Sequence, residues 1–494
     1  MYGVCIRKKC KTLQAKRIVF IIHLSKGGVI YDRKEKMPDT LIIVASVVLL
    51  VAILSWIIPS GTYDYQEMNI NGRIRNVAID GTYHTIDKSE VTTTGFLGFF
   101  SVLYRGCVEA ADVIFMILCC CGTFGVVVKT GAFHAGIGTI LKKLKGKEIL
   151  LVPIIMMIFG LGGSVFGMAS EFYGFYPLIV GLGVALGYDA MFGFAIIAVG
   201  EFVGFMGATL NPYSVGIAQT ISGVELYSGT GYRAICFVIF MAISIIYVMV
   251  YGRKIKKNPG ASVVLGEKNI HAFDRDELNE YSFTLKDGLV LLDVLVVLVV
   301  LMLGLIKWGW DFPQLCGLFL LMSMIAAAIC KWSPNKWCSE FIDSAKTAMW
   351  GCILTGIAKA ITVVMQDAQI MDTVIYGLSN VLKNAPHAVS AQVMLVVQTL
   401  INFFIPSATG QASATMPIMA QLADIIGVSR QTAVLAFQFG DGLSNIFWPT
   451  ADIVIICGLG GISLQKWYKW FTPLFLILFV TQAILLGIAT GIGF

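Results

Sequence analysis

The chain has 494 residues, of which 57% are hydrophobic and 13% are charged, and its mean hydropathy is +0.80. Soluble globular domains carry about a quarter charged residues, so this composition excludes a water-soluble protein and indicates a surface largely covered by lipid. The net charge of +6 does not indicate nucleic-acid binding, because the basic residues cluster beside apolar runs. We therefore expect an integral membrane protein that binds no nucleic acid.

The N-terminal segment 1–36 is basic, and its apolar stretch 18–23 is too short for a signal-peptide core or a span. We expect a cytoplasmic basic tail, and the alternative is that translation begins at Met37. The next segment, 37–95, combines a first span with a loop that mixes both signs of charge. Because cytoplasmic loops are enriched in lysine and arginine, this mixed loop is predicted to lie outside.

Several nearly charge-free runs approach the length that crosses a bilayer, which is about 20 apolar residues for a hydrocarbon core of roughly 30 Å. Their number and length suggest about 10–12 membrane segments in one domain, some of them re-entrant. Basic clusters at 142–147 and 253–257 mark cytoplasmic ends. The runs are 41–58, 113–128, 149–160, 234–250, 289–305 and 471–489.

Two halves of the chain carry similar motifs in the same order. Serine, glycine and serine recur with the same spacing in 163–170 and 406–413. Further along, the pair 200–201 (Gly-Glu) matches the pair 440–441 (Gly-Asp). Motifs that recur in the same order over many residues predict an internal repeat.

The two similar halves start on opposite faces of the membrane. A short amphipathic stretch follows the external loop at 96–106, and a second follows a basic, cytoplasmic segment at 337–346. We therefore predict an all-α polytopic membrane protein with two inverted-topology repeats, each with a re-entrant hairpin and a broken helix. Repeat one is assigned to 96–251 and repeat two to 337–494. Between them, 252–336 holds a cytoplasmic linker and two connecting spans.

Small polar residues interrupt an apolar run in each half. Broken helices in inverted repeats build the sites of many secondary transporters, and irregular backbone at membrane depth is tolerated where it lines a cavity or is buried. Close helix packing is the structural alternative, but matched breaks in both halves favour a substrate site. The residues assigned to it are Ser164, Gly167, Ser170, Glu171, Ser407, Thr409, Gly410 and Gln411.

A second paired feature combines neutral oxygens with acids inside predicted membrane segments. Carbonyl and amide oxygens suit Na⁺ as well as a polar substrate, and charge at that depth costs several kcal/mol unless it is paired or solvated. Kinked-helix packing and structural ion pairs are the alternatives. Helical spacing places Asp441, Ser444 and Asn445 on one face. The residues assigned to ion or proton coupling are Asn211, Glu201, Asp441, Ser444 and Asn445.

Two further charged residues are candidates for this site. Asp452 is another acid within a predicted membrane segment, and Lys359 is the opposite charge that can neutralise one of the acids. The twelve cysteines lie mostly within apolar runs and the five histidines show no ligand spacing. We expect no metal site, no cofactor beyond a coupling ion, and no catalytic residue.

Seven motifs resemble the YfcC-type branch of the C4-dicarboxylate anaerobic carrier family, and the similarity runs from about Met37 to the C-terminus. The resemblance implies the ion transporter superfamily fold, with two inverted repeats and a re-entrant hairpin in each. Relatives include arginine/ornithine antiporter-like proteins. The motifs are FGLGGSVFGMA (159–169), LGYD (186–189), TLNP (209–212), VGIAQ (215–219), NFFIPS (402–407), TMPIM (415–419) and FQFGDG (437–442).

Three positions depart from the pattern of the family that the chain resembles. Ser170-Glu171 keeps one of two consecutive acids, Glu201 stands where small residues are usual, and Lys359 stands where an arginine is commoner. These changes move charge around the presumed site, so the substrate does not follow from the resemblance.

We expect a secondary active transporter, either a symporter or an antiporter, that works by alternating access in the bacterial inner membrane. Its substrate is a small charged metabolite, an amino acid or a C4-dicarboxylate-type organic acid, coupled to Na⁺ or H⁺. The alternatives are a membrane-embedded enzyme or sensor, for which the linker is too short to hold a catalytic domain, and a channel. Besides substrate, ion and lipid, the question of a homodimer stays open.

Overall fold

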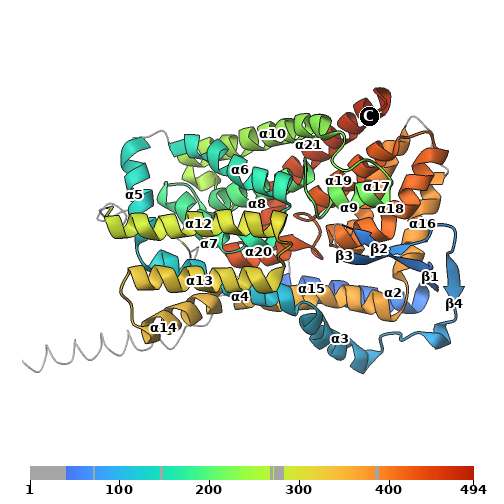
Figure 1. Ribbon diagram of the computed structural model, residues 1–494, viewed down its shortest axis with the longest axis horizontal. Helices are drawn as coiled ribbons and strands as arrows, with labels where there is room; N and C mark the ends of the chain where they lie inside the picture. The colour runs from blue at the N-terminus through green and yellow to red at the C-terminus, as the bar shows by residue number, and fades with distance from the viewer. Residues whose placement is uncertain (1–39, 71–72, 145–147, 268–270, 272–282, 384–388) are drawn as a thin grey trace, which may run out of the picture. The chain divides into compact units, whose positions relative to one another are not determined.

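The computed structural model describes residues 40–70, 73–144, 148–267, 271, 283–383 and 389–494. The predicted tail at 1–36 lies outside these residues. Nearly all the described secondary structure is helical, and Figure 1 shows most of the helices running alongside one another. The prediction of an all-α polytopic membrane protein is confirmed.

Within the described residues, seven helical stretches are long and apolar enough to cross a membrane. Their sequences hold few charges, so a helix, which satisfies its own backbone hydrogen bonds, is the form that lipid permits. They are α2 (Thr40–Ile57), α4 (Ala111–Lys129), α10 (Thr230–Lys257), α12 (Leu285–Lys307), α13 (Phe312–Ile329), the stretch of α14 (Pro334–Ala345) and α15 (Met349–Asp367), and α21 (Leu464–Gly491).

Shorter helices are joined by irregular backbone. An 11-residue helix such as α6 is about 16 Å long, roughly half the thickness of the hydrocarbon core, so it is too short to cross the membrane by itself. The first set is α6 (Leu151–Leu161), η3 (Gly162–Phe166), η4 (Ser170–Phe172), α7 (Phe175–Ala185), α8 (Ala190–Met206) and α9 (Val215–Ile221). The second set is α17 (Ser390–Phe404), α18 (Ala408–Ile425), α19 (Arg430–Ser444) and α20 (Asp452–Gly460).

The order of elements from α3 (Phe96–Glu109) to α10 is repeated from α14 to α21. A short helix, a long helix, a second short helix, a helical hairpin, a broken helix and a final long helix follow one another in both stretches. The second short helix is α5 (Ala132–Leu144) in the first stretch and α16 (Met371–Lys383) in the second. Corresponding helices agree in length: α4 and α15 have 19 residues each, and α10 and α21 have 28 each.

The two stretches exchange helix contacts reciprocally. Helix α3 packs on α15 while α14 packs on α4, and α9 packs on α18 while α20 packs on α7. Small residues permit the closest of these approaches, since a Cβ on Gly106 of α3 would collide with the carbonyl of Gly356 in α15. At the centre α8 packs on α19. The contacts therefore have a twofold pattern that matches the repeated order of elements.

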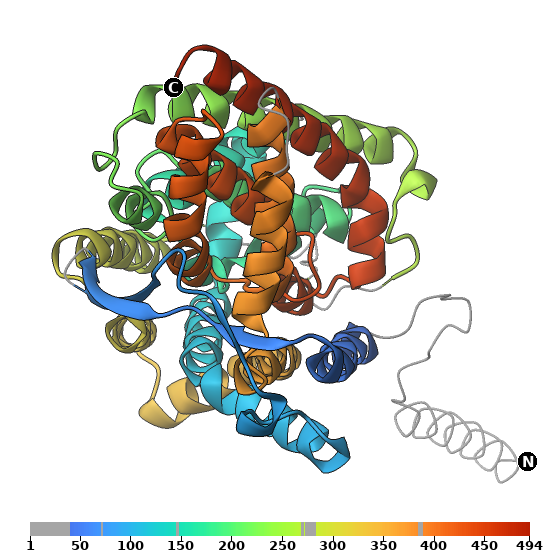
Figure 2. The same cartoon turned by 90° about the vertical axis from the view of Figure 1, so that its right-hand side faces the viewer.

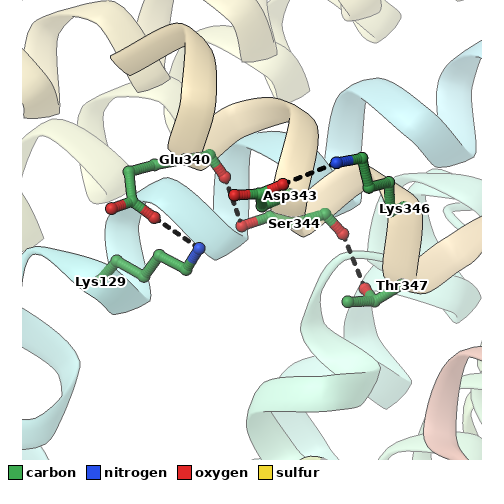
Figure 3. A network of polar contacts seen from close by, with 6 residues as sticks. All are labelled: Lys129, Glu340, Asp343, Ser344, Lys346 and Thr347. Carbon is green, nitrogen blue, oxygen red and sulfur yellow. Dashed lines mark hydrogen bonds and ion pairs between the residues drawn. The ribbon is translucent and has the colours of Figure 1, made fainter. Parts of the chain in front are cut away.

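Two ion pairs occupy corresponding places in this pattern. Lys129, the last residue of α4, pairs with Glu340 of α14 at 2.5 Å (Figure 3). Asp367, the last residue of α15, pairs with Arg105 of α3. The two pairs thus join equivalent helices with the signs of charge exchanged.

The segment predicted as an external loop contains two small antiparallel sheets. Strand β1 (Ser60–Thr62) pairs with β4 (His84–Ile86), and β2 (Tyr65–Ile70) pairs with β3 (Arg73–Ala78). The sheets, drawn as blue strands in Figures 1 and 2, lie against α16 and α18. Asp372 of α16 holds the segment, because it accepts hydrogen bonds from the Tyr63 amide at 3.0 Å and the Tyr65 hydroxyl at 2.8 Å.

Candidate functional site

The tip of the first hairpin, between α6 and α7, is bound to the break that follows α8. Ser164 is fully buried, and its Oγ donates to the carbonyl of Gly207 at 3.1 Å. The amide of Thr209 donates to the carbonyl of Ser164 at 2.9 Å. Gly167 has a φ of +68°, and a Cβ there would collide with the side chain of Asn211. Glycine is therefore required at this turn both for its conformation and for the close approach.

The break in repeat one spans 207–214, between α8 and α9. Asn211 Oδ1 accepts from the amides of Tyr213 at 2.9 Å and Ser214 at 3.2 Å, which folds the backbone back on itself. The Nδ2 atom of Asn211 and the Oγ atom of Ser214 are buried, and neither has a hydrogen-bond partner among the described residues. Polar groups in this state are available to a ligand.

The tip of the second hairpin, between α17 and α18, reaches across to repeat one. Ser407 caps α18, accepting from the Gly410 amide at 3.3 Å, and is exposed. Thr409 Oγ1 donates to the carbonyl of Tyr213 at 2.9 Å. The break in repeat one therefore contacts both hairpin tips. Thr409 and Gly410 are partly exposed, as are Gly167 and Ser170 of the first hairpin.

Gln411, predicted to contact substrate, is fully buried and bound to protein. Its Nε2 donates to the side chain of Gln398 at 2.7 Å and to its carbonyl at 2.9 Å. Its Oε1 accepts from Asn402 at 3.2 Å. In this conformation Gln411 holds the second hairpin together.

Asn402 gathers the polar groups of repeat two. Its Nδ2 donates to Asp441 Oδ1 at 2.8 Å and to Asn445 Oδ1 at 3.0 Å. Asp441 is fully buried, and its Oδ2 has no hydrogen-bond partner in the described part of the chain. Asn445 lies at the start of the break 445–451 between α19 and α20. Asp441 and Asn445 thus converge as the helical spacing predicts.

Ser444 does not join this convergence. Its Oγ donates to the carbonyl of Gly440 at 2.5 Å, within its own helix. Serine inside a helix commonly bonds the carbonyl one turn back, because that acceptor is always within reach. Ser444, predicted to share a face with Asp441 and Asn445, therefore bonds to the backbone and not to either of their side chains.

Glu201 and Asp441 occupy equivalent positions in α8 and α19. The two helices begin with capping residues, Asp189 and Ser429, and each acid lies at the same distance along its helix from its cap. Glu201 is fully buried, its Oε2 accepts from Tyr176 at 2.8 Å, and its Oε1 has no partner among the residues described.

Two more acids lie beside the breaks. Asp452, in the first turn of α20, accepts from the hydroxyl of Tyr173 at 2.7 Å. Glu171 is buried after the first hairpin tip and accepts from the amide of Ala169 at 3.0 Å. Tyrosine hydroxyls and a backbone amide, all neutral donors, therefore take the place of cations at these carboxylates.

Lys359 does not neutralise any of the four acids. It is partly buried in α15 and forms no ion pair with a residue that the structure describes. The expectation of a neutralising pair is therefore not met: α15 makes no substantial contact with α8 or α19, which carry Glu201 and Asp441. It does pack on α20, but Asp452 of that helix accepts from Tyr173 instead.

The two broken helices touch each other directly. Gln438 of α19 donates from Nε2 to the carbonyl of Phe205 in α8 at 2.7 Å. A Cβ on Gly442 would collide with the backbone of Met206. Hairpin tips 162–170 and 405–411 and breaks 207–214 and 445–451 thus form one contiguous set, called the central region below.

The outer turns of the two hairpins contact different parts of the chain. Asp189, after the first hairpin, accepts from Ser262 at 2.6 Å, so this turn adjoins the linker rich in lysine. Arg430, after the second, pairs with Asp424 at 2.7 Å and donates to the carbonyl of Ser222 at 2.8 Å. Both aspartates lie at hairpin ends.

Sequence reasoning missed Arg233, Asn402, Tyr173 and Tyr176. Arg233 precedes an apolar run and resembles an ordinary flanking charge, yet it is only 1% exposed. The signal that could have identified the other three is a polar side chain within the apolar arm of a hairpin.

Two cavities in the described part of the chain lie against hairpin arms. One of about 500 Å³ separates β2 and β3 from α18 and is lined by Gln66, Asp80, Gln421 and Arg430. The other, of about 260 Å³, lies between α4, α7 and the end of α14. Each cavity thus lies beside the second arm of one hairpin.

The chain belongs to the C4-dicarboxylate anaerobic carrier family, whose sequence profile matches residues 37–491. It is 32% identical to the "Putative basic amino acid antiporter YfcC" of Escherichia coli strain K12, over 94% of this chain and 98% of that protein. It is 27% identical to an uncharacterized protein of Haemophilus influenzae, over 93% of this chain and 99% of that one. The chain is therefore a multi-pass membrane transporter, as its motifs predict.

Two solved transporter structures also resemble this chain. The YdaH transporter of Alcanivorax borkumensis aligns with a TM-score of 0.42 at 14% identity, covering 92% of this chain and 99% of that one. MtrF of Neisseria gonorrhoeae, from a class of antimetabolite efflux pumps, aligns with a TM-score of 0.41 at 16% identity, covering 92% and 96%.

Proposed function

We propose that this carrier exchanges a basic amino acid across the bacterial cytoplasmic membrane by alternating access. The observation that carries the proposal is the imbalance of buried charge in and beside the central region. Glu171, Glu201, Asp441 and Asp452 form no ion pair with a lysine or arginine of the described residues. Glu171, Glu201 and Asp441 are buried and Asp452 is half-buried. Charges in such places are costly unless compensated, so these carboxylates favour a cationic ligand, protons, or both.

A basic amino acid matches the groups that the central region offers. Its cationic side chain suits the carboxylates, and its own carboxylate suits the donors left without partners, Asn211 Nδ2 and Ser214 Oγ. A dicarboxylate carries two anions and needs cations, whereas the buried Arg233 already donates to backbone. The Escherichia coli relative is named as a putative basic amino acid antiporter, which supports a basic substrate.

Exposure divides the proposed roles between substrate and ion. Ser407, Thr409, Gly410, Gly167 and Ser170 are the tip residues that remain accessible, and we assign them to the substrate. Ser164 and Gln411 hold the tips, since their polar groups are bound to protein.

The buried groups are assigned to coupling. Asp441, Asn445 and Glu201 are buried and present oxygen atoms to a proton or Na⁺. Of these, Asp441 is the acid that we assign to the coupling proton, because Asn402 fixes one of its oxygens and leaves the other without a partner. Asn211, predicted for coupling, has its oxygen bound to two backbone amides and offers only its donor Nδ2, so we assign it to the substrate carboxylate.

We also propose that the two repeats, 96–251 and 337–494, are inverted with respect to each other, as in many carriers that work by alternating access. The repeated order of elements and the exchanged helix pairs support a twofold relation. The outer turn of one hairpin meets the basic linker while that of the other meets the loop after α9, which supports opposite orientations.

Thermal unfolding of the purified protein with candidate ligands tests the proposed substrate. A ligand at ten times its dissociation constant stabilises the folded state by about 1.4 kcal/mol. We expect arginine, lysine or ornithine to raise the melting temperature and succinate to leave it unchanged. Stabilisation by dicarboxylates alone would overturn the assignment of substrate class.

A further inference from the structure

Arg233 is a buried cation without an anionic partner. It lies in the first turn of α10 and is 1% exposed. Its Nε and Nη2 atoms donate to the carbonyl of Thr209 at 3.4 and 3.1 Å, and Nη2 also donates to Thr230 Oγ1 at 3.2 Å. No carboxylate in the described residues forms an ion pair with it. A guanidinium buried in this way needs compensation from the backbone dipoles that it faces.

The carbonyl that Arg233 binds lies just beyond the end of α8. The last carbonyls of a helix lack partners in the helix and carry a partial negative charge. Where a half-helix ends inside the membrane, such carbonyls are the usual ligands of a coupling cation. Thr209 also donates its amide to Ser164, so the same residue connects Arg233 to the first hairpin tip.

The equivalent position in the second half holds a neutral donor. Trp467 lies in the first turn of α21, which corresponds to α10, and is fully buried. Its Nε1 donates to the carbonyl of Ile446 at 2.8 Å, just beyond the end of α19. The two breaks are therefore capped from the same place, one by a charged side chain and the other by an uncharged one.

We propose that Arg233 is a positioning residue that supplies a fixed cation at the break of repeat one, where a mobile coupling cation would otherwise bind. Its charge holds the Thr209 carbonyl, and through Thr209 the first hairpin tip. Repeat one then needs no bound Na⁺ at the Thr209 carbonyl. The role in coupling rests on the proposed transport function, whereas the need for a cation beside Thr209 does not.

Chemical rescue of Arg233→Ala tests the need for a cation. The variant leaves a space beside Thr209, which guanidinium can fill with charge and urea can fill with the same shape but no charge. In proteoliposomes we expect counterflow of a basic amino acid to fall by about tenfold or more, because a charged hydrogen bond is lost. Millimolar guanidinium should restore part of the rate and urea should not. Arg233→Lys, which keeps the charge, should retain more activity than Arg233→Ala.

Trp467→Phe is the matched control, because it removes the corresponding donor without removing charge. Guanidinium should not improve its counterflow. Wild-type rates in Arg233→Ala, no effect of guanidinium, or equal rescue by urea would each overturn the proposal. Arg233→Gln keeps a donor without charge and is measured in parallel, so that a failure of Arg233→Ala to fold leaves a second neutral variant. Wild-type counterflow in Arg233→Gln would likewise refute the need for charge.

The melting temperature separates this inference from the proposed function. Guanidinium at low concentration should raise the melting temperature of Arg233→Ala, or of Arg233→Gln, but not that of the wild type. This measurement needs no transported substrate. A wild type that exchanges no basic amino acid would therefore refute the proposed substrate while the melting experiment still decides the role of Arg233.

Discussion

The amide of Asn402 donates to Oδ1 of Asp441 at 2.8 Å, and both side chains are fully buried. The same amide also serves Asn445 at 3.0 Å, so it holds two residues of the broken helix in register with the hairpin arm α17. The other carboxylate oxygen of Asp441 has no hydrogen-bond partner in the part of the chain described. One oxygen is thus fixed by the protein, and the second is available to a proton or a cation.

Asp441→Asn should separate ion coupling from exchange. The amide resembles the protonated acid in shape and charge, so the carrier should still exchange substrate but should no longer use an ion gradient. We expect wild-type counterflow and loss of gradient-driven uptake in proteoliposomes. Loss of both activities would show that Asp441 binds the substrate, and full activity in both assays would show that its role is structural.

Asn402→Ala should destabilise the protein by about 1–3 kcal/mol, because it leaves buried acceptors on Asp441 and Asn445 unsatisfied. Gln392→Ala is the control, since Gln392 donates to a single backbone carbonyl, that of Ala483. Its loss should cost about 0.5–1.5 kcal/mol. Thermal unfolding of both variants gives the comparison. Equal destabilisation would mean that the Asn402 amide is no more than an ordinary buried donor.

Single cysteines should distinguish the two hairpin tips. Ser407 is exposed and Ser164 is fully buried, with its hydroxyl bound to the break. In a background without native cysteines, Ser407→Cys should react rapidly with a small aqueous thiol reagent and be protected by substrate. Ser164→Cys should react much more slowly. Similar rates at both positions, or no protection at position 407, would remove the accessible tip from the proposed substrate site.

The orientation of the repeats can be tested with an impermeant thiol reagent. We propose that the β sheets and the outer turn of the second hairpin face outward and that the linker faces the cytoplasm. Cysteines at Ile74 and Ile425 should be labelled from outside intact cells, and a cysteine at Leu265 should be spared. All three side chains are exposed in the structure, so the side of the membrane on which each cysteine lies decides whether the reagent labels it. The inverted topology also predicts that the loop 384–387 lies outside the cell, but this loop is not among the described residues. Labelling of Leu265→Cys together with Ile425→Cys would contradict the inverted topology.

The ion pairs Lys129–Glu340 and Arg105–Asp367 should contribute little to stability. Both are partly exposed, and such pairs are typically worth up to about 1 kcal/mol. We expect Lys129→Glu to lower the melting temperature slightly and the added Glu340→Lys exchange to restore it. Counterflow should be unaffected in the double variant. A large loss of stability that the exchange does not repair would indicate that Lys129 has another partner.

The sequence predicted the breaks well because their composition is unusual for a membrane segment. Glycine, serine and proline are uncommon inside apolar runs, so their presence indicates a break in the helix. The matched positions of Glu201 and Asp441 followed because the motifs occur in the same order in both halves. The partners of these acids did not follow, because Asn402, Tyr173 and Tyr176 are brought close only by packing between helices. No local pattern distinguishes Asn402, which binds Asp441, from Gln392, which binds backbone.

Three differences from expectation have local physical causes. Ser444 returns its hydroxyl to its own helix, where an acceptor is nearer than the central region. Lys359 stands on α15, which makes no substantial contact with the helices of Glu201 and Asp441, and Asp452 accepts from Tyr173 instead. The strands within 60–86 were not predicted, because their mixed charges leave no clear alternation of apolar and polar residues. Their register also depends on contacts with α16 and α18.

Counterflow in proteoliposomes tests the central claim most directly. Purified protein is reconstituted with unlabelled arginine inside, and entry of labelled arginine from a low outside concentration is measured without any ion gradient. We predict transient accumulation of labelled arginine that requires internal arginine, lysine or ornithine and is absent with internal succinate. Accumulation of labelled succinate against internal succinate, with none of arginine, would contradict it.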